Sequence, residues 1–258
     1  MTTKYPIVLV HGMILKDFRF YRAFRKIRDF LKDEGCRVYV LTHDGIGTMA
    51  NNAAQMKEMI EKILETEQVE KVNLIAHSKG GVDSRYMISY LDMEDKVASL
   101  TTLSSPHHGS KMCAKLLKMP KWMAKFISFW ANFWYRIFGD KHPDLYTLAT
   151  QLTDEYFVKF NEETPNSEKV YYQSYSSDLE HRKWVKMYFS HRFSRWCEGS
   201  ATDGIVAVES SKWGEYRGNM PDDYDHMEMV AAHGSKKVLE SVFQFYKTIV
   251  SDLISLGF

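Results

Sequence analysis

Short apolar runs alternate along the chain with longer segments in which apolar residues recur at helical spacing. The runs are rich in Val, Ile and Leu, which is typical of strands buried on both faces; they are Ile7–Val10, Arg37–Leu41, Val72–Ala76, Leu100–Ser104 and Val170–Ser174. The helical segments are Asp17–Asp33, Asn52–Glu65, Gly80–Leu91 and Val238–Leu256. Strands that alternate with helices predict the α/β class, with a mostly parallel central sheet flanked by helices.

Composition narrows the classes of function. The chain has 258 residues, of which 45% are hydrophobic, so it can build one large domain with a sizeable core or two small domains. Its 34 basic residues are balanced by 33 acidic ones, which gives no reason to expect a nucleic-acid partner. The three cysteines, Cys36, Cys113 and Cys197, show no metal-ligand spacing and do not require a disulfide framework.

A serine stands directly after the third predicted strand, in "NLIAHSKGG". A strand that turns sharply into a helix can present such a serine as a nucleophile, provided that small residues lie two before it and two after it. Ala76 and Gly80 occupy these positions around Ser78. The alternative is an N-cap serine on an ordinary helix, but the predicted strand and helix on either side favour the nucleophile.

Four segments of the sequence resemble the bacterial triacylglycerol lipases. They are "YPIVLVHGM", "VNLIAHSKGGVDSRY", "TTLSSPHHGS" and "DGIVAVESSKWG", and they follow one another in the expected order. The chain is most similar to the secreted lipases of the Pseudomonas, Burkholderia and Proteus type. It shares A-H-S-x-G and "DHMEMV" with the larger Bacillus-type lipases. The resemblance implies an α/β-hydrolase fold in one domain, residues 1–258, with a helical lid or cap inserted at about 110–165.

The resemblance also implies the acid and the base that would serve the serine. Chain order in this fold is serine, acid, histidine. The segment "YDHMEMV" matches the lipase loop that carries the base, which selects His226, and the D-G-x-V motif selects Asp203 as the acid. The residues alone leave other choices open: His233 is also late enough, and Asp178 and Asp225 are alternative acids. Asp225 is adjacent to His226, where a hydrogen bond between the two side chains is difficult to form.

These assignments predict a complete mechanism. Ser78 attacks an ester carbonyl while His226 takes its proton, and Asp203 holds the imidazole in the required tautomer. The backbone N–H groups of Met13 and Lys79 are expected to form the oxyanion hole.

An unusually aromatic segment, "KWMAKFISFWANFWYRIF", follows the fourth predicted strand. Its candidate lid or substrate residues recur at helical spacing and are Trp122, Phe126, Phe129, Trp130, Phe133 and Trp134. One interpretation is a core helix. The other, favoured by its position in the chain, is a lid or a wall of the acyl pocket that makes transient contact with a lipid interface. The segment is too short and too charged to span a bilayer, so no transmembrane segment is expected.

The sequence departs from the lipases that it resembles at two places. These lipases often bind structural calcium near the histidine loop, and Glu228 matches one acidic ligand by position, but Ala232, His233 and Gly234 are poor calcium ligands. We therefore predict no metal site, with Glu228 as a weak candidate ligand, and no required cofactor. Glu209 stands where the second cysteine of the Pseudomonas-type disulfide would fall.

The predicted function is that of a lipase, a serine ester hydrolase that cleaves lipid carboxyl esters, with acylglycerols as the expected substrates. The alternatives are a phospholipase, a general carboxylesterase or a non-catalytic lipid-binding relative. The N-terminus shows no signal-peptide pattern, so the sequence as written predicts a cytoplasmic protein. A chain from which a signal had been removed would read the same and would be secreted.

Overall fold

The computed structural model describes residues 1–13, 20–179 and 187–258, and in this part of the chain it contains one six-stranded sheet. The strand order is β2-β1-β3-β4-β5-β6, and every neighbouring pair is parallel. The strands are β1 (Ile7–Val10), β2 (Val38–Val40), β3 (Val72–His77), β4 (Val97–Leu103), β5 (Tyr171–Ser176) and β6 (Glu215–Asn219). The predicted α/β class with a mostly parallel sheet is confirmed.

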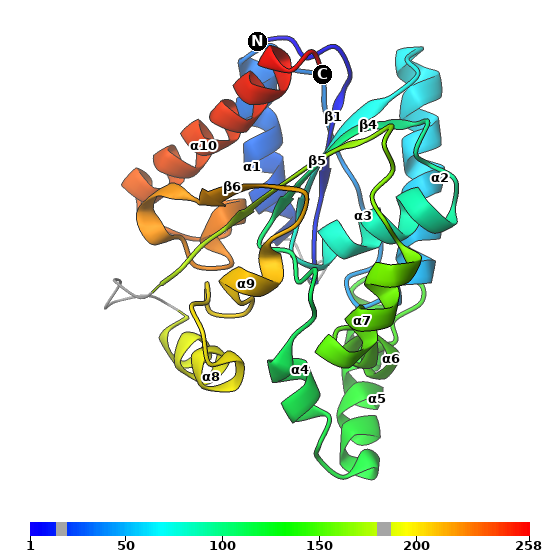
Figure 1. Cartoon of the computed structure of the whole chain (residues 1–258), viewed down its shortest axis with the longest axis vertical. Helices are drawn as coiled ribbons and strands as arrows, with labels where there is room; N and C mark the ends of the chain where they lie inside the picture. The colour runs from blue at the N-terminus through cyan, green and yellow to red at the C-terminus, as the bar shows by residue number, and fades with distance from the viewer. Residues whose placement is uncertain (14–19, 180–186) are drawn as a thin grey trace.

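Helices cover both faces of this sheet, as Figure 1 shows. One face packs on α1 (Phe20–Asp33) and α10 (Lys236–Ser255), and the other packs on α2 (Met49–Glu67) and α3 (Lys79–Tyr90). Successive side chains of a strand point to opposite faces. Ile7 and Leu9 of β1 accordingly enter the first core, while Val8 and Val10 enter the second, and all four are fully buried.

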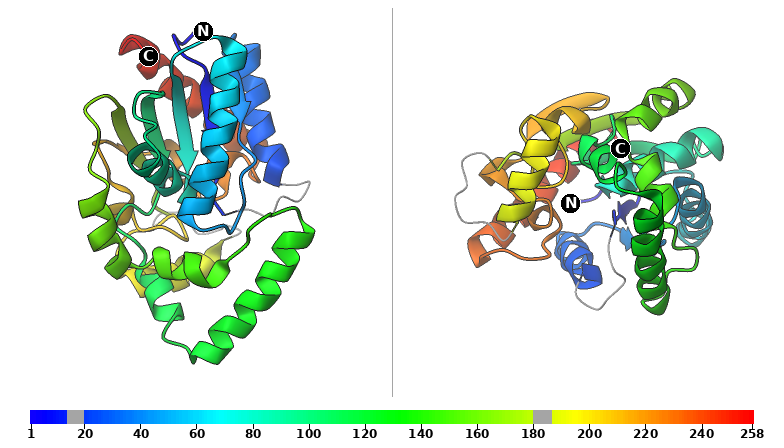
Figure 2. Two further views of the ribbon diagram at one scale, coloured as in Figure 1. Left: turned by 90° about the vertical axis from the view of Figure 1, so that its right-hand side faces the viewer. Right: turned by 90° about the horizontal axis from the view of Figure 1, so that it is seen from below.

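The connection from β4 to β5 contains four helices: α4 (Lys111–Leu116), α5 (Lys121–Ile137), α6 (Leu145–Gln151) and α7 (Asp154–Glu163). These helices occupy the segment for which an insertion was predicted. Figures 1 and 2 show that α4, α5 and α6 lie beyond the carboxyl ends of the strands. In a parallel α/β sheet this is the end at which binding sites form.

The chain after β5 brings two further segments to the same end of the sheet. Between β5 and β6 lie α8 (Tyr188–Glu198) and α9 (Val208–Ser211); between β6 and α10 lie the 3-10 turns η1 (Pro221–Asp223) and η2 (Glu228–Val230). The termini lie at the opposite end, where the N–H of Lys4 donates to the carbonyl of Phe258 at 3.0 Å.

One predicted bound falls outside the described residues, and one strand was not predicted. The predicted start of the first helix, Asp17, lies outside the described residues. Strand β6 was not predicted, because its side chains alternate between exposed and half-buried positions and its sequence, EYRGN, has no apolar run. Within the described residues, none of the helices is both long enough and apolar enough to cross a membrane.

Candidate active site

Ser78 lies on a strained turn between β3 and α3. Its backbone has φ 55° and ψ −131°, a region that residues other than glycine rarely adopt. The turn is held by the N–H of Ser78, which donates to the carbonyl of Leu103 in β4 at 2.9 Å. The hydroxyl is thereby lifted beyond the end of the sheet, as the elbow pattern predicted.

Close backbone approach explains the small residues around this turn. A Cβ on Gly80 would lie 2.5 Å from the carbonyl oxygen of His11. A Cβ on Gly12 would lie 2.7 Å from Cβ of Ser78 and 3.2 Å from the backbone nitrogen of Lys79. The loop after β1 therefore packs directly against the elbow, and only glycine fits at these contacts.

The structure brings together the three side chains that the lipase resemblance selected. Nδ1–H of His226 donates to Oδ2 of Asp203 at 2.7 Å, and the hydroxyl of Ser78 lies 2.9 Å from Nε2, where it can donate its proton. All three residues are buried, with Asp203 and His226 exposing 3% of their surface or less. This geometry fits a general base that takes a proton from a serine nucleophile.

Asp203 is fixed by backbone groups as well as by the imidazole. Its Oδ1 accepts from the N–H of Ile205 at 2.9 Å and of Val206 at 2.8 Å. Its carbonyl accepts from the N–H of His226 at 3.0 Å. The carboxylate can therefore turn neither away from the histidine nor toward solvent.

A second imidazole packs against the histidine of this site. The ring centre of His77 lies 4.4 Å from that of His226, and His77 is buried. Burial, followed by the proximity of His226, lowers the pKa of His77 well below its usual range. His77 is therefore neutral near pH 7 and adds no charge beside the imidazole of His226.

Met13 and Lys79, the predicted oxyanion residues, both line the cavity beside Ser78. Lys79 is the first residue of α3, where backbone N–H groups favour developing negative charge. His11 stabilises the loop that carries Met13: its Nδ1 contacts the carbonyl of Gly12 at 2.8 Å, and its ring stacks on that of His43 at 3.9 Å.

The Lys79 side chain is buried and paired, so the residue contributes its backbone and not its charge to the cavity. Nζ donates to the carboxylate of Asp83 at 2.5 and 2.7 Å, and Asn52 donates to the same carboxylate at 2.9 Å. Burial lowers the pKa of Lys79 and raises that of Asp83, while their mutual attraction opposes both shifts. The pair fixes the first turn of α3 beneath the elbow.

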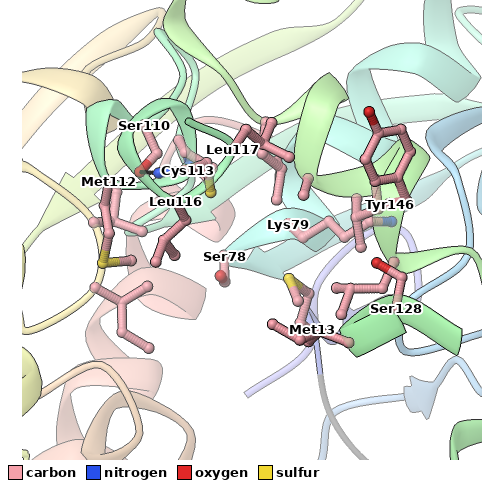
Figure 3. A pocket seen from close by; sticks show the side chains of 18 of the residues that line it. Met13, Ser78, Lys79, Ser110, Met112, Cys113, Leu116, Leu117, Ser128 and Tyr146 are labelled. Carbon is pink, nitrogen blue, oxygen red and sulfur yellow. Dashed lines mark hydrogen bonds between the residues drawn. The ribbon is translucent and has the colours of Figure 1, made fainter. Parts of the chain in front are cut away.

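An apolar cavity of about 540 Å³ adjoins Ser78 and His226. In Figure 3, Ser78 lies between Met13 on one side and Met112 and Leu116 on the other. Much of the wall comes from α4, α5 and α6, including Cys113, Leu116, Ile127, Tyr135, Leu145 and Leu148. A cavity of this volume and lining fits an apolar chain next to a reacting carbonyl.

The aromatic residues of α5 correct one part of the prediction. The six predicted side chains are between 46% and 72% exposed, so a core helix is excluded. None of them lines the cavity, so the expectation that they wall an acyl pocket is wrong; α5 contributes the other side of the helix, with Ala124, Ile127, Ser128 and Tyr135. Their lid function stays a prediction.

Two carboxylates hold the C-terminal end of α5 against the loop after β2. Asp140 accepts from the N–H of Gly45 at 2.8 Å and of Ile46 at 3.0 Å. Asp44 reciprocates by accepting from the N–H of Lys141 at 2.9 Å and of His142 at 2.7 Å. These four hydrogen bonds attach the C-terminal end of α5 to the loop after β2.

The predicted candidate metal ligand, Glu228, lies in a small cluster. Asp225, Glu228 and His233 each offer a ligand atom within 4.8 Å of the others. One of these atoms is an imidazole nitrogen, whereas calcium takes oxygen ligands. Oδ1 of Asp225 also accepts from the N–H of Met227 and of Glu228, each at 2.9 Å. The donor set does not fit calcium, and the independence from metal remains a prediction.

Helix α8 was missed by the sequence reasoning. Its His191 is buried, while Phe189 and Trp196 are 85% and 69% exposed. The available signal was the spacing of Phe189, Phe193 and Trp196, which puts all three on one side of a helix with Arg192 among them.

A parallel sheet with helices on both faces, a serine on a strained turn after β3 and a hydrogen-bonded histidine and aspartate define an α/β-hydrolase. The family model of palmitoyl protein thioesterases matches residues 6–213. The chain belongs to this family.

Curated relatives carry lipase names. The chain is 32% identical over 230 residues to triacylglycerol lipase 2 of Saccharomyces cerevisiae, covering 86% of this chain and 65% of that protein. It is 37% identical over 109 residues to a triacylglycerol lipase of Vibrio cholerae, covering 42% of this chain and 34% of that one. The resemblance to triacylglycerol lipases is confirmed, although the chain spans less than two thirds of these relatives.

Solved structures support the fold. The metagenomic carboxyl esterase MGS0156 matches with a TM-score of 0.72 at 16% identity, over 96% of this chain and 76% of that one. Bacillus licheniformis lipase BlEst2 in its mature form matches with a TM-score of 0.65 at 21% identity, over 93% of this chain and 92% of that one. The predicted α/β-hydrolase fold is confirmed.

Proposed function

We propose that this protein is a serine ester hydrolase that cleaves carboxyl esters of lipids, with acylglycerols as the expected substrates. One observation carries the proposal: the hydrogen-bonded series Asp203, His226 and Ser78 ends at an apolar cavity large enough for an acyl chain. The names of the lipase relatives support the same substrate class.

The proposed reaction forms an acyl-enzyme. Oγ of Ser78 attacks the ester carbonyl while its proton moves to Nε2 of His226, and Asp203 stabilises the resulting imidazolium. The carbonyl oxygen becomes an oxyanion, which accepts from the N–H groups of Met13 and Lys79. His226 then gives its proton to the departing alkoxide as the C–O bond breaks.

Water completes the cycle by the same residues. His226 takes a proton from water as the water oxygen attacks the acyl carbonyl, and it returns that proton to Oγ of Ser78 when the acid leaves. Each oxyanion donor supplies about 3 kcal/mol of transition-state stabilisation in enzymes of this kind. No step uses a metal or a cofactor.

Helix α5 would act as a lid. Its inner residues, among them Ile127 and Ser128, line the cavity, while the six aromatic side chains predicted for the lid are exposed. A lipid surface that contacts those aromatic residues would stabilise an arrangement in which the cavity is open to long acyl chains.

A second candidate function is hydrolysis of long-chain acyl thioesters. The match to the palmitoyl protein thioesterase family favours it. The same Ser78 would attack the thioester carbonyl, and the leaving group would be a thiolate, which departs with less help from an acid than an alkoxide because thiols are the stronger acids.

Labelling with a fluorophosphonate probe tests the nucleophile. Ser78 is expected to react, and the Ser78→Ala variant is not. A folded protein that does not label at Ser78 would refute the proposal and favour a non-catalytic lipid-binding relative.

A substrate panel then tests the class. We expect rates on p-nitrophenyl esters to rise with acyl chain length and to increase further when the long-chain ester is presented in an emulsion. Preference for acetate and indifference to emulsion would indicate a general carboxylesterase, and faster hydrolysis of phospholipids than of acylglycerols would indicate a phospholipase. Parallel rates on palmitoyl oxygen esters and thioesters with the same solubilising group decide between the two candidate functions.

A further inference from the structure

Helix α8 exposes aromatic side chains that the cavity does not use. Tyr188, Phe189, Phe193 and Trp196 are between 42% and 85% exposed, and none of them lines the cavity beside Ser78. Together with α5, this short helix carries most of the large apolar side chains that are exposed in the described part of the chain. An apolar surface of this extent on a folded protein indicates a partner.

The inner side of α8 is held against α4 by hydrogen bonds. The carboxylate of Glu198 accepts from the hydroxyl of Ser110 at 3.0 Å and from the N–H of Met112 at 2.9 Å. Lys115 of α4 donates to the carbonyl of Cys197 at 2.9 Å, and its ammonium lies 4.3 Å from the ring centre of Trp196. The aromatic residues of α8 are therefore on a helix whose opposite side is bound to α4.

Helices α8 and α5 lie at the same end of the molecule. Figures 1 and 2 show both beyond the carboxyl ends of the strands. Helix α4 contacts α8 and α6, and α6 contacts α5, so α4 and α6 connect the two aromatic helices. The cavity wall is built largely from α4, α5 and α6, so both aromatic helices lie next to elements that line the cavity.

Charge at this end selects the kind of partner. Residues 110–139 contain five lysines and one arginine and no acidic residue, and α8 adds Arg192 and Arg195 with only Glu198 of opposite charge, which is buried and bound to α4. The whole chain carries a net charge of only +1, so these two segments are locally basic. Interfaces with proteins are depleted in lysine, whereas aromatic residues beside lysines and arginines are typical of helices that lie on anionic membranes.

We propose that the exposed aromatic side chains of α8, with the basic residues beside them, extend the lipid-contacting side of α5 into a docking surface for an anionic lipid bilayer. Helix α8 would serve docking alone, by inserting Phe189, Phe193 and Trp196 among the headgroups. This inference goes beyond the proposed ester hydrolysis, because binding to the bilayer requires no reaction at Ser78.

Vesicle sedimentation with ether-linked lipids tests the docking surface without any contribution from hydrolysis. The Ser78→Ala protein is expected to bind vesicles that contain phosphatidylglycerol at least ~10-fold more tightly than vesicles of phosphatidylcholine alone, since each basic residue near the surface adds about fivefold. High salt should weaken this binding.

Substitutions then locate the surface. Phe189→Ser, Phe193→Ser and Trp196→Ser together should reduce vesicle binding at least ~10-fold. Lys118→Glu, Lys121→Glu and Arg192→Glu together should remove the preference for anionic lipid. The matched control is Ile254→Ser with Leu256→Ser, two exposed apolar residues of the α10 end, which should bind like the parent.

A soluble substrate separates docking from folding and from the proposed function. With Ser78 intact, the α8 variant should hydrolyse a short, water-soluble ester at the parental rate in the absence of vesicles. Unchanged vesicle binding by the α8 variant would overturn the proposal. The proposal would also be overturned if the parent did not bind vesicles and instead formed a dimer that the α8 substitutions dissociate. The surface on α8 would then bind a second copy of this chain. Analytical sedimentation measures the dimer.

Discussion

Ser78 and His226 are 148 residues apart in the chain, yet their side chains meet at 2.9 Å. Backbone hydrogen bonds hold each of the two residues in place. The turn at Ser78 is held by β4, and the loop of His226 is held by the carbonyl of Asp203. Because main-chain groups hold both residues, a substitution of one neighbouring side chain should leave the fold intact. Its main effect should be on the geometry of the catalytic hydrogen bonds and therefore on activity.

Asp203→Asn should reduce kcat by about 10⁴-fold while the protein stays folded. The amide would offer an N–H where Oδ2 now accepts, and the imidazole would lose the tautomer that leaves Nε2 free to accept the serine proton. Hydrolysis of a p-nitrophenyl ester measures the effect. Asp178→Asn, at the alternative acid considered from the sequence, is the control and should keep most of the activity; a larger loss there would move the acid to Asp178.

Gly12→Ala should reduce kcat by about 10²–10³-fold, comparable to the loss of one oxyanion donor. Its Cβ would meet Ser78 Cβ at 2.7 Å and the carbonyl of His77 at 3.0 Å, and would push the N–H of Met13 away from the elbow. Reaction rates with a fluorophosphonate, compared with circular dichroism of the same protein, separate this effect from unfolding. A variant with normal labelling would exclude the loop from the oxyanion hole.

Residue-scale chemistry was largely readable from the sequence, because the elbow pattern and the D-G-x-V and D-H motifs are local. The crossed carboxylates Asp44 and Asp140 were not, since they are about a hundred residues apart and bind backbone groups, which leave no side-chain signature. The same holds for the ion pair of Lys79 and Asp83, whose burial only the fold reveals.

At the scale of elements, the two sides of α5 have different surroundings: one lines the cavity and the other is exposed. The inner side closes the cavity, and the end at Asp140 is fixed to the loop after β2. The sequence predicted this helix from its periodicity but could not tell which side would face the protein, because both sides are apolar. Helix α8 and strand β6 escaped prediction for a related reason: outward aromatic residues and a half-exposed edge break the rule that apolar residues are buried.

Asp140→Ala should lower the free energy of unfolding by about 1–3 kcal/mol, because two buried N–H groups, of Gly45 and Ile46, would lose their acceptor. Urea denaturation measures this change, and limited proteolysis should cut near the end of α5 sooner than in the parent. Glu162→Gln on the exposed side of α7 is a control that should change neither. Unaltered stability of the Asp140 variant would show that water replaces the carboxylate without cost.

At the scale of the whole molecule, buried histidines should make stability depend on pH. Burial lowers the pKa of His77 well below the usual range; it does the same for His107, where Arg85 adds to the shift. The unfolded chain takes up these protons below about pH 6.5 and the folded protein does not, so stability falls as pH falls. Each histidine should cost about 1.4 kcal/mol between about pH 7.5 and 5.5.

Urea midpoints across this pH range test the effect. His107→Gln should reduce this loss by about 1.4 kcal/mol, since it leaves the other buried histidines in place. A urea midpoint that is independent of pH between about 5.5 and 7.5 would contradict this, because it would mean that both imidazoles can be protonated in the folded protein.

The hydrogen bond between Lys4 and Phe258 has a practical consequence. Both chain ends emerge at the pole farthest from α5 and α8. Any polypeptide fused to either end, such as a fluorescent reporter, would extend away from the proposed docking surface on α5 and α8. The ends are also close enough for a short linker to join them, so a circularly permuted chain opened in a surface loop should retain the fold.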